Sequence, residues 1–187
     1  GKMTAIAGDA SIDAGTTVNN TGVMTAGINA SITANSNIDN EGAMTATGGN
    51  VDINSANGIL INNATAELQA GNGDVTLQSY NKLENYGDAT AYGKVVINSR
   101  FANVNNAGNL TAEKQDVSIT ASTSVQNGGM LIATAGNACI DAGTLVNNTS
   151  VMKAGINTRI NAGTTVINSG KMTAIAGDAS IDAGTTV

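Results

Sequence analysis

Acidic residues and one cysteine are the side chains through which this sequence could do catalytic chemistry, because the 187-residue chain contains no histidine. This excludes a serine or cysteine nucleophile activated by histidine, and it excludes the common zinc sites. Glycoside hydrolysis requires two carboxylates at one groove. Asp13, Asp141 and Asp182 share one repeat position, but neutral residues occupy that position in the intervening repeats. The sequence therefore predicts neither an enzyme nor a bound metal or cofactor.

The single cysteine, Cys139, directly precedes Ile140. The equivalent positions in two other repeats hold Ser11 and Ser180, so we expect Cys139 to point outward as a replacement for serine. A lone outward cysteine could also bridge to a partner, since the chain offers no second cysteine for a disulfide within itself.

The aromatic residues are the other distinctive side chains, and they are few. All four lie close together in the sequence, as Tyr80, Tyr86, Tyr92 and Phe101. Tyr80 and Arg100 occupy equivalent turn positions in adjacent repeats, so the two could stack. Exposed aromatic side chains on an otherwise smooth surface suit contact with a sugar or a protein. We predict that the four aromatics and Arg100 form a contact patch.

Charge and composition restrict the partners of the chain. The net charge is −6, and nucleic-acid binding requires a basic footprint, so we expect no nucleic-acid partner. No apolar run approaches the roughly 18 residues of a membrane-spanning helix, so we expect no membrane insertion. The remaining candidates are neighbouring coils or copies of the same protein, end to end, and a host-cell receptor or glycan.

The elements that must position these side chains recur about every 21 residues, and each repeat has three apolar anchor positions. The first anchor is Met3, Met24, Met44, Leu68, Ala89, Leu110, Leu131, Met152 and Met172. The second is Ile12, Ile32, Ile53, Leu77, Ile97, Ile119, Ile140, Ile160 and Ile181. The third is Val18, Ile38, Ile61, Leu83, Val104, Val125, Val146, Val166 and Val187.

The residue two positions after each anchor is also fixed in type. It is alanine after the first anchor and alanine or serine after the second. After the third anchor it is asparagine, at Asn20, Asn40, Asn63, Asn85, Asn106, Asn127, Asn148 and Asn168. Because alternate residues of a strand face the same side, each repeat is predicted to hold three short strands around one interior. The asparagines are predicted to form a hydrogen-bonded ladder at a corner.

A further row of aspartate or asparagine lies three residues before the second anchor and is interrupted only by Lys94. Its members are Asp9, Asn29, Asn50, Asp74, Asp116, Asn137, Asn157 and Asp178. Glycine precedes this position in six repeats. Since glycine and asparagine tolerate positive φ, we expect tight corners with left-handed backbone here.

Three strands per repeat around one interior predict an all-β fold, a parallel β-helix (solenoid) of about nine coils of 20–24 residues. Residues 1–187 form a single array, with coils starting near residues 1, 22, 42, 66, 87, 108, 129, 150 and 170. The string of residues 1–18 returns unchanged as residues 170–187. We therefore expect the chain to be a fragment of a longer array.

The repeated runs resemble those of filamentous haemagglutinin and related giant exoproteins of Gram-negative bacteria. They stand as GKMTAIAGDASIDAGTTVNNTG at residues 1–22 and GMLIATAGNACIDAGTLVNNT at residues 129–149. The resemblance covers the whole chain and implies a right-handed parallel β-helix, export by two-partner secretion, and an extracellular position at the bacterial cell surface. Some relatives are contact-dependent growth inhibition proteins, whose shaft carries a toxin. The chain has no proline, so it lacks the Asn-Pro-Asn-Gly type motif of the family's secretion domain.

The resulting functional prediction is a structural shaft, acting as a spacer or adhesin of the filamentous haemagglutinin type. One alternative is the subunit of a self-assembling extracellular β-solenoid filament, because the repeated 18-residue end fits that reading equally. A carbohydrate-active β-helix enzyme is a further alternative, which requires a groove with paired acids.

Overall fold

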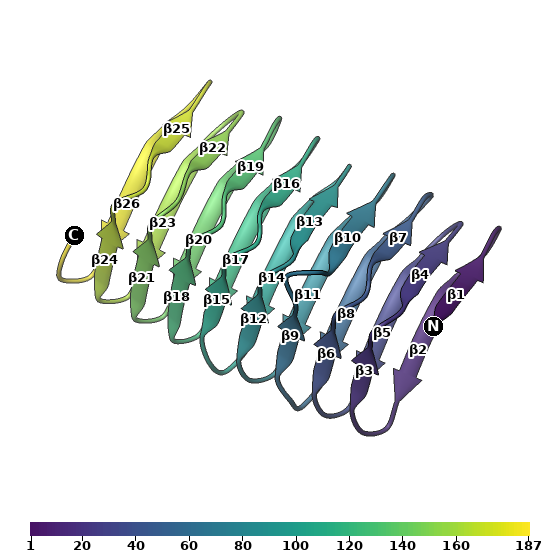
Figure 1. The fold of residues 1–187 in the computed structure, drawn as a ribbon. Coiled ribbons are helices and arrows are strands. Elements are labelled where there is room, and N and C mark those ends of the chain that lie inside the picture. Colours follow the sequence, from purple (N-terminus) through teal and green to yellow (C-terminus); the bar gives the residue numbers. More distant parts are fainter.

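The chain is a three-sided parallel β-solenoid in the computed structural model, which describes all 187 residues (Figure 1). Each of the first eight circuits of the backbone adds one strand to each of three parallel sheets, the ninth adds a strand to two of them, and the structure contains no helix. The predicted all-β solenoid of about nine coils with three strands per coil is thereby confirmed. We call the sheets A, B and C and number the coils 1 to 9 from the N-terminus.

Sheet A opens each coil and carries the first anchor. Its strands are β1 (Lys2–Ala5), β4 (Val23–Ala26), β7 (Met44–Ala46), β10 (Glu67–Ala70), β13 (Asp88–Ala91), β16 (Leu110–Ala112), β19 (Leu131–Ala133), β22 (Met152–Ala154) and β25 (Met172–Ala174). The register places each anchor on its copy in the next coil, as in the pairs Met3–Met24 and Met24–Met44.

Sheet B follows in every coil and carries the second anchor on five-residue strands. These are β2 (Ala10–Ala14), β5 (Ala30–Ala34), β8 (Val51–Ser55), β11 (Val75–Ser79), β14 (Val95–Ser99), β17 (Val117–Ala121), β20 (Ala138–Ala142), β23 (Thr158–Ala162) and β26 (Ala179–Ala183). Their burial alternates, so that Val51, Ile53 and Ser55 are buried while Asp52 and Asn54 between them face outward.

Sheet C completes the coil with short strands that end on the asparagine row. These are β3 (Val18–Asn20), β6 (Ile38–Asn40), β9 (Leu60–Asn62), β12 (Leu83–Asn85), β15 (Val104–Asn106), β18 (Ser124–Asn127), β21 (Leu145–Asn148) and β24 (Thr165–Asn168). In coil 9 only an isolated bridge between Thr165 and Thr186 continues this sheet.

The interior is one continuous hydrophobic column, in which 40 buried apolar residues form a single cluster. Each coil needs its neighbours to close this column, since the same anchor has very different exposure at the end and inside. Met3 in coil 1 is 39% exposed, whereas Met24 in coil 2 is 1% exposed. The stacking of coils, and not any single coil, therefore produces the dry core on which the fold depends.

The third anchor of coil 3 is Leu60, and the prediction of Ile61 was wrong. Leu60 is fully buried and pairs with Ile38 below and Leu83 above. Ile61 faces outward between Asp39 and Glu84. The error arose because coil 3 contains inserted residues on both sides of β9, and a one-residue shift along a strand exchanges the inner and outer faces.

Candidate functional site

The predicted aromatic patch is divided over the three corners of the solenoid. Tyr80 follows β11 at the corner between sheets B and C, and Arg100 and Phe101 follow β14 at the same corner one coil later. Tyr86 follows β12 at the corner between sheets C and A, and Tyr92 follows β13 at the corner between sheets A and B. The aromatic residues lie within residues 80–101, which make up about one circuit of the backbone. Residues that are close in sequence therefore lie at three different corners.

Tyr80, Arg100 and Phe101 form the one compact group that the structure assembles from that patch. The rings of Tyr80 and Phe101 pack at 4.5 Å between centroids with a 46° tilt. The Arg100 guanidinium carbon lies 5.3 Å from the centre of the Phe101 ring. Tyr80 and Arg100 do occupy equivalent positions, as the Ser79–Ser99 register shows, but the stacking partner of both is Phe101.

A shallow hollow of about 480 Å³ lies beside this group on the outer face of sheet B. Its floor carries three amide side chains in one column, since Asn54, Gln78 and Asn98 pair across β8, β11 and β14. Tyr80 and Arg100 form one wall. An aromatic ring beside amides and a guanidinium can present an apolar face and several hydrogen-bonding groups to a sugar.

Tyr92 has a cationic neighbour of its own. The Lys114 Nζ lies 5.7 Å from the centre of the Tyr92 ring, one coil further along the same corner. The pair is exposed, and Tyr86 lies apart from it at the next corner.

The predicted asparagine ladder exists and is buried except at Asn168, with Asn62 in place of the predicted Asn63. Each amide nitrogen donates to the side-chain oxygen of the next coil at 2.7–2.8 Å, from Asn20 to Asn168 without a gap. Its members are Asn20, Asn40, Asn62, Asn85, Asn106, Asn127, Asn148 and Asn168. Asn63 lies just outside the ladder and donates to the Asp39 carboxylate instead.

The second amide hydrogen of these asparagines fixes the corner of their own coil. Asn85, for example, also donates to the backbone oxygen of Gly87 at 2.9 Å. Asn106 and Asn127 repeat this contact with Gly108 and Gly129. One neutral amide therefore satisfies two acceptors and offers an acceptor itself, in a place where no water is needed to complete the hydrogen bonds.

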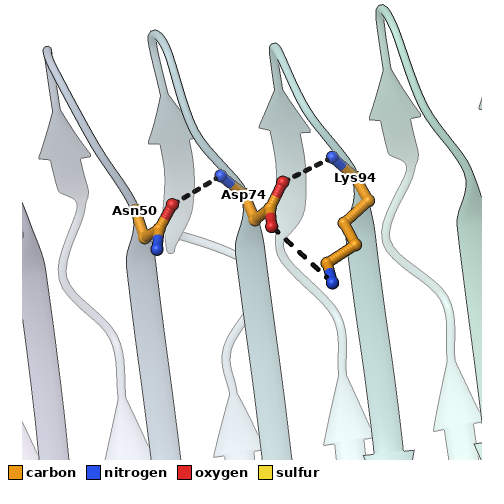
Figure 2. Close-up of polar contacts among 3 residues, drawn as sticks. All are labelled: Asn50, Asp74 and Lys94. Atoms are coloured by element: carbon orange, nitrogen blue, oxygen red, sulfur yellow. Dashed lines mark hydrogen bonds and ion pairs between the residues drawn. The ribbon is translucent and has the colours of Figure 1, made fainter.

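The aspartate and asparagine row forms a second ladder, of a different kind, at the exposed corner between sheets A and B. Here the side-chain oxygen accepts a hydrogen bond from the backbone nitrogen of the next coil. Figure 2 shows three consecutive members: Asp74 N donates to Asn50 Oδ1 at 2.9 Å, and Lys94 N donates to Asp74 Oδ1 at 2.8 Å. Lys94 has no side-chain oxygen, so it accepts nothing from the following coil; its Nζ lies 3.8 Å from Asp74 Oδ2 instead.

Glycine often precedes the aspartate and asparagine row for a reason that the sequence did not predict. No residue of the chain has a positive φ, so the expected left-handed corners do not occur. A Cβ on Gly73 would instead lie 2.3 Å from Asn50 Oδ1, and one on Gly93 would lie 2.1 Å from Asp74 Oδ1. Glycine leaves room for the ladder oxygen of the coil below. Glycine is common here but not obligatory, because Ile28 and Ile156 hold the same position above Asp9 and Asn137, whose side-chain oxygens still accept from Asn29 N and Asn157 N.

The carboxylates are dispersed in the structure, as the spacing predicts. Asp141 is bound to Arg159, whose Nη2 lies 2.8 Å from Oδ1, and Asp13 and Asp182 lie on the end coils. No three residues among His, Cys, Asp and Glu gather where they could hold a metal ion. Burial on the outer face of sheet B raises the pKa of Asp52, although a hydrogen bond with Thr76 lowers it in part.

Cys139 lies on the outer face of β20, between Ser118 and Arg159 of the adjacent strands. It is partly buried and free. Burial raises the pKa of the Cys139 thiol, and a hydrogen bond with Arg159 offsets this only in part. The thiol therefore stays protonated at neutral pH, which makes it a poor nucleophile.

Comparison of the chain with protein-family models, with curated proteins and with solved structures gave no match. None of the elements is a helix of the length and apolar character needed to cross a membrane. The fold and the corner geometry define the structural class of the protein. It is a three-sided parallel β-solenoid with two polar ladders along its axis and one aromatic group at a corner.

Proposed function

We propose that the chain is a shaft segment of a secreted bacterial surface protein of the filamentous haemagglutinin type, a spacer that holds other parts away from the cell. The observation that carries this proposal is the axial direction of the bonding. The strand pairings of all three sheets and both polar ladders join one coil to the next, so the hydrogen bonds run along the rod. Load along the axis is shared by many bonds in parallel at every coil junction.

The repeat motifs supply the family and the location in this proposal, through their resemblance to exported bacterial shafts. An antibody raised against the chain tests it on cells of the source organism. Labelling of intact cells, at a distance from the outer surface in electron micrographs, is the expected result. Labelling that requires permeabilised cells contradicts the proposal. Proteinase K added to intact cells provides a second test, because it can reach the protein only if the protein lies outside the cell.

A self-assembling filament is the second candidate, and the return of the string of residues 1–18 as residues 170–187 favours it, because a recurring sequence fits a repeating subunit. Electron microscopy of the purified chain separates the two candidates. Single short rods support the shaft, and long fibres of the unmodified chain support the filament.

The Tyr80, Arg100 and Phe101 group is the surface that suits adhesion to a receptor or glycan. Its rings are exposed and lie beside the amide column of Asn54, Gln78 and Asn98. The double variant Tyr80→Ala with Phe101→Ala is expected to reduce binding of chain-coated beads to cultured epithelial cells at least severalfold. Tyr92→Ala, at a different corner, is the matched control. Equal binding by both variants contradicts an adhesive role for this corner.

A further inference from the structure

The floor of the hollow on sheet B consists of amide groups without a partner in the protein. These are the side chains of Asn54, Gln78 and Asn98, which pair across β8, β11 and β14. None of the three side chains makes a hydrogen bond to another residue of the chain. The same outward row of sheet B continues to Asn161, whose Nδ2 does donate to Asp141 Oδ1 at 3.2 Å. The hollow therefore offers three free amides in a row, each able to donate and to accept.

Arg100, in the wall of this hollow, is a cation without a carboxylate partner. The three ion pairs of the chain join other residues: Lys82 with Glu84, Lys94 with Asp74, and Arg159 with Asp141. The residues that line the hollow include no acid. On the outer faces of β8, β11 and β14 the only acid is Asp52, which lies in the other outward row. In a chain of net charge −6, Arg100 thus faces neutral groups.

The second arginine of the chain shows what Arg100 lacks. Arg159 lies two residues before the outward row and is bound by Asp141, the member of that row one coil earlier. Arg100 lies two residues after the same row, and the member one coil earlier is Gln78. The chain therefore has an amide where an acid would pair with Arg100. A carboxylate that binds this guanidinium has to come from a ligand.

The wall of the hollow is held in position by its neighbours within the chain. The Tyr80 ring packs against the Phe101 ring at 4.5 Å, and Arg100 lies over the other ring of this pair at 5.3 Å from its centre. Ser79, directly before Tyr80, is buried and donates from Oγ to Gly58 O at 2.9 Å. Because these contacts already order the aromatic ring and the guanidinium, a ligand would lose less binding free energy to ordering them.

The spacing of the amides favours a sugar chain over a peptide strand. Neighbouring strands of a sheet lie about 4.8 Å apart, whereas an extended peptide rises about 3.3 Å per residue. A peptide laid along the axis therefore does not place equivalent groups opposite successive amides. A pyranose ring with its glycosidic oxygen covers about one coil spacing, so the hydroxyl groups of successive rings can meet successive amides. The face of one ring can pack on Tyr80.

We propose that this hollow binds an acidic glycan, in which the carboxylate of a uronic or sialic acid unit pairs with Arg100. The planar guanidinium can hold a carboxylate through two parallel hydrogen bonds. The amides of Asn54, Gln78 and Asn98 bind hydroxyl groups of the same glycan. This inference deepens the adhesive role proposed for this corner, and it rests on that role for its biological purpose.

Isothermal titration calorimetry of the full chain tests the proposal with two matched pairs of probes. One pair is an oligogalacturonate and the same oligosaccharide after reduction of its carboxyl groups to alcohols. The other pair is sialyllactose and lactose. We expect the acidic member of at least one pair to bind about tenfold more tightly than its neutral counterpart, or better, because it makes charge-assisted hydrogen bonds. Added salt should reduce this preference, since the site is exposed.

Three variants locate the carboxylate in the hollow. Arg100→Gln is expected to remove the preference for the acidic probe. Arg159→Gln removes the same charge from the same sheet, at a cation that already has a partner, and should keep the preference. Gln78→Glu should weaken binding of the acidic probe about tenfold, because its carboxylate would occupy Arg100 as Asp141 occupies Arg159. Thermal unfolding by circular dichroism verifies that each variant is folded.

Three results would overturn the proposal. The first is that no acidic probe binds more tightly than its neutral counterpart. The second is an equal loss of binding in Arg100→Gln and Arg159→Gln, and the third is unchanged binding in Gln78→Glu. The adhesive role survives any of them if Tyr80→Ala with Phe101→Ala still reduces binding of coated beads to cells, since the corner then recognises a different ligand. The shaft proposal is independent of all three, because it rests on where the protein lies on the cell.

Discussion

The two polar ladders occupy neighbouring corners of the same solenoid, yet they follow different rules. At the corner between sheets C and A every member is asparagine, and the inner members such as Asn85 and Asn106 are fully buried. At the corner between sheets A and B the ladder is exposed and accepts asparagine, aspartate and, once, lysine.

Burial and direction of bonding explain the difference. A buried ladder residue must donate two hydrogen bonds and accept one without carrying charge, and the side-chain amide does this with the shape required here. A residue of the exposed ladder needs only a side-chain oxygen that accepts a hydrogen bond from the backbone nitrogen of the next coil. Aspartate meets that need equally, and where lysine supplies no oxygen the backbone nitrogen of the next coil lies at an exposed corner, where it is accessible to solvent. The strictness of a repeat position thus follows from its solvent access.

The strongest test of this comparison is to place a charge in the buried ladder. Asn106→Asp keeps the acceptor for Asn85 but loses both donated bonds, to Asn127 and Gly108. We expect a loss of about 3–5 kcal/mol in the free energy of unfolding, typical of an uncompensated buried charge. Urea unfolding measures it. The control Asp74→Asn in the exposed ladder should change stability by about 0.5 kcal/mol or less. Equal effects of the two variants would contradict the comparison.

Two neighbouring glycines beside the buried ladder differ in how closely the adjacent coil packs against them, and substituting each with alanine tests this difference. A Cβ on Gly129 would lie 2.0 Å from Gly108 O, whereas one on its neighbour Gly128 would have no atom nearer than 3.9 Å. Gly129→Ala is expected to cost about 1–3 kcal/mol, as overpacking does. Gly128→Ala should be neutral or stabilise by about 0.4–1 kcal/mol, because alanine restricts the unfolded chain more than glycine. Thermal unfolding of the two neighbours decides the point.

Repair of the exposed ladder at its interruption sharpens the comparison further. Lys94→Asn should restore the acceptor for Asp116 N, because Ile28 and Ile156 hold the position of Gln115 in coils where the ladder bond is made. We expect a gain of about 0.5–1.5 kcal/mol in the free energy of unfolding, the usual net contribution of one hydrogen bond. Urea unfolding measures it, and an unchanged or lower stability would contradict the role given to the side-chain oxygen.

Asp52 offers the smallest of these tests and depends on pH. Its folded pKa is raised, mainly by burial, so the native state disfavours the carboxylate relative to the unfolded chain. Its contribution to stability is complete below the ordinary aspartate pKa of 3.8 and is lost as the pH rises through the raised value. Asp52→Asn should therefore stabilise the fold at pH 7 by more than it does at pH 3. Chemical unfolding at the two pH values measures this, and an equal effect at both would contradict it.

Sequence reasoning was successful where one period governs everything. The rows of anchors predicted three strands per coil and their register, because in a solenoid each residue packs on its own copy in the next coil. It failed at coil 3, where inserted residues on both sides of β9 left Leu60 and Ile61 as equally plausible anchors. Only the packing of Leu60 between Ile38 and Leu83 resolves that choice.

The amino-acid sequence alone determined the class of fold, the buried column and the asparagine ladder, because these follow from a repeat that stacks like on like. Tertiary structure decided which atoms meet at the corners. It separated Tyr86 and Tyr92 from the Tyr80 group, because the strands are only a few residues long and the chain turns a corner after each of them. It also showed that glycines such as Gly93 make room for a side-chain oxygen of the neighbouring coil and do not provide a left-handed backbone. The sequence could not show this, because that oxygen lies some 20 residues away along the chain.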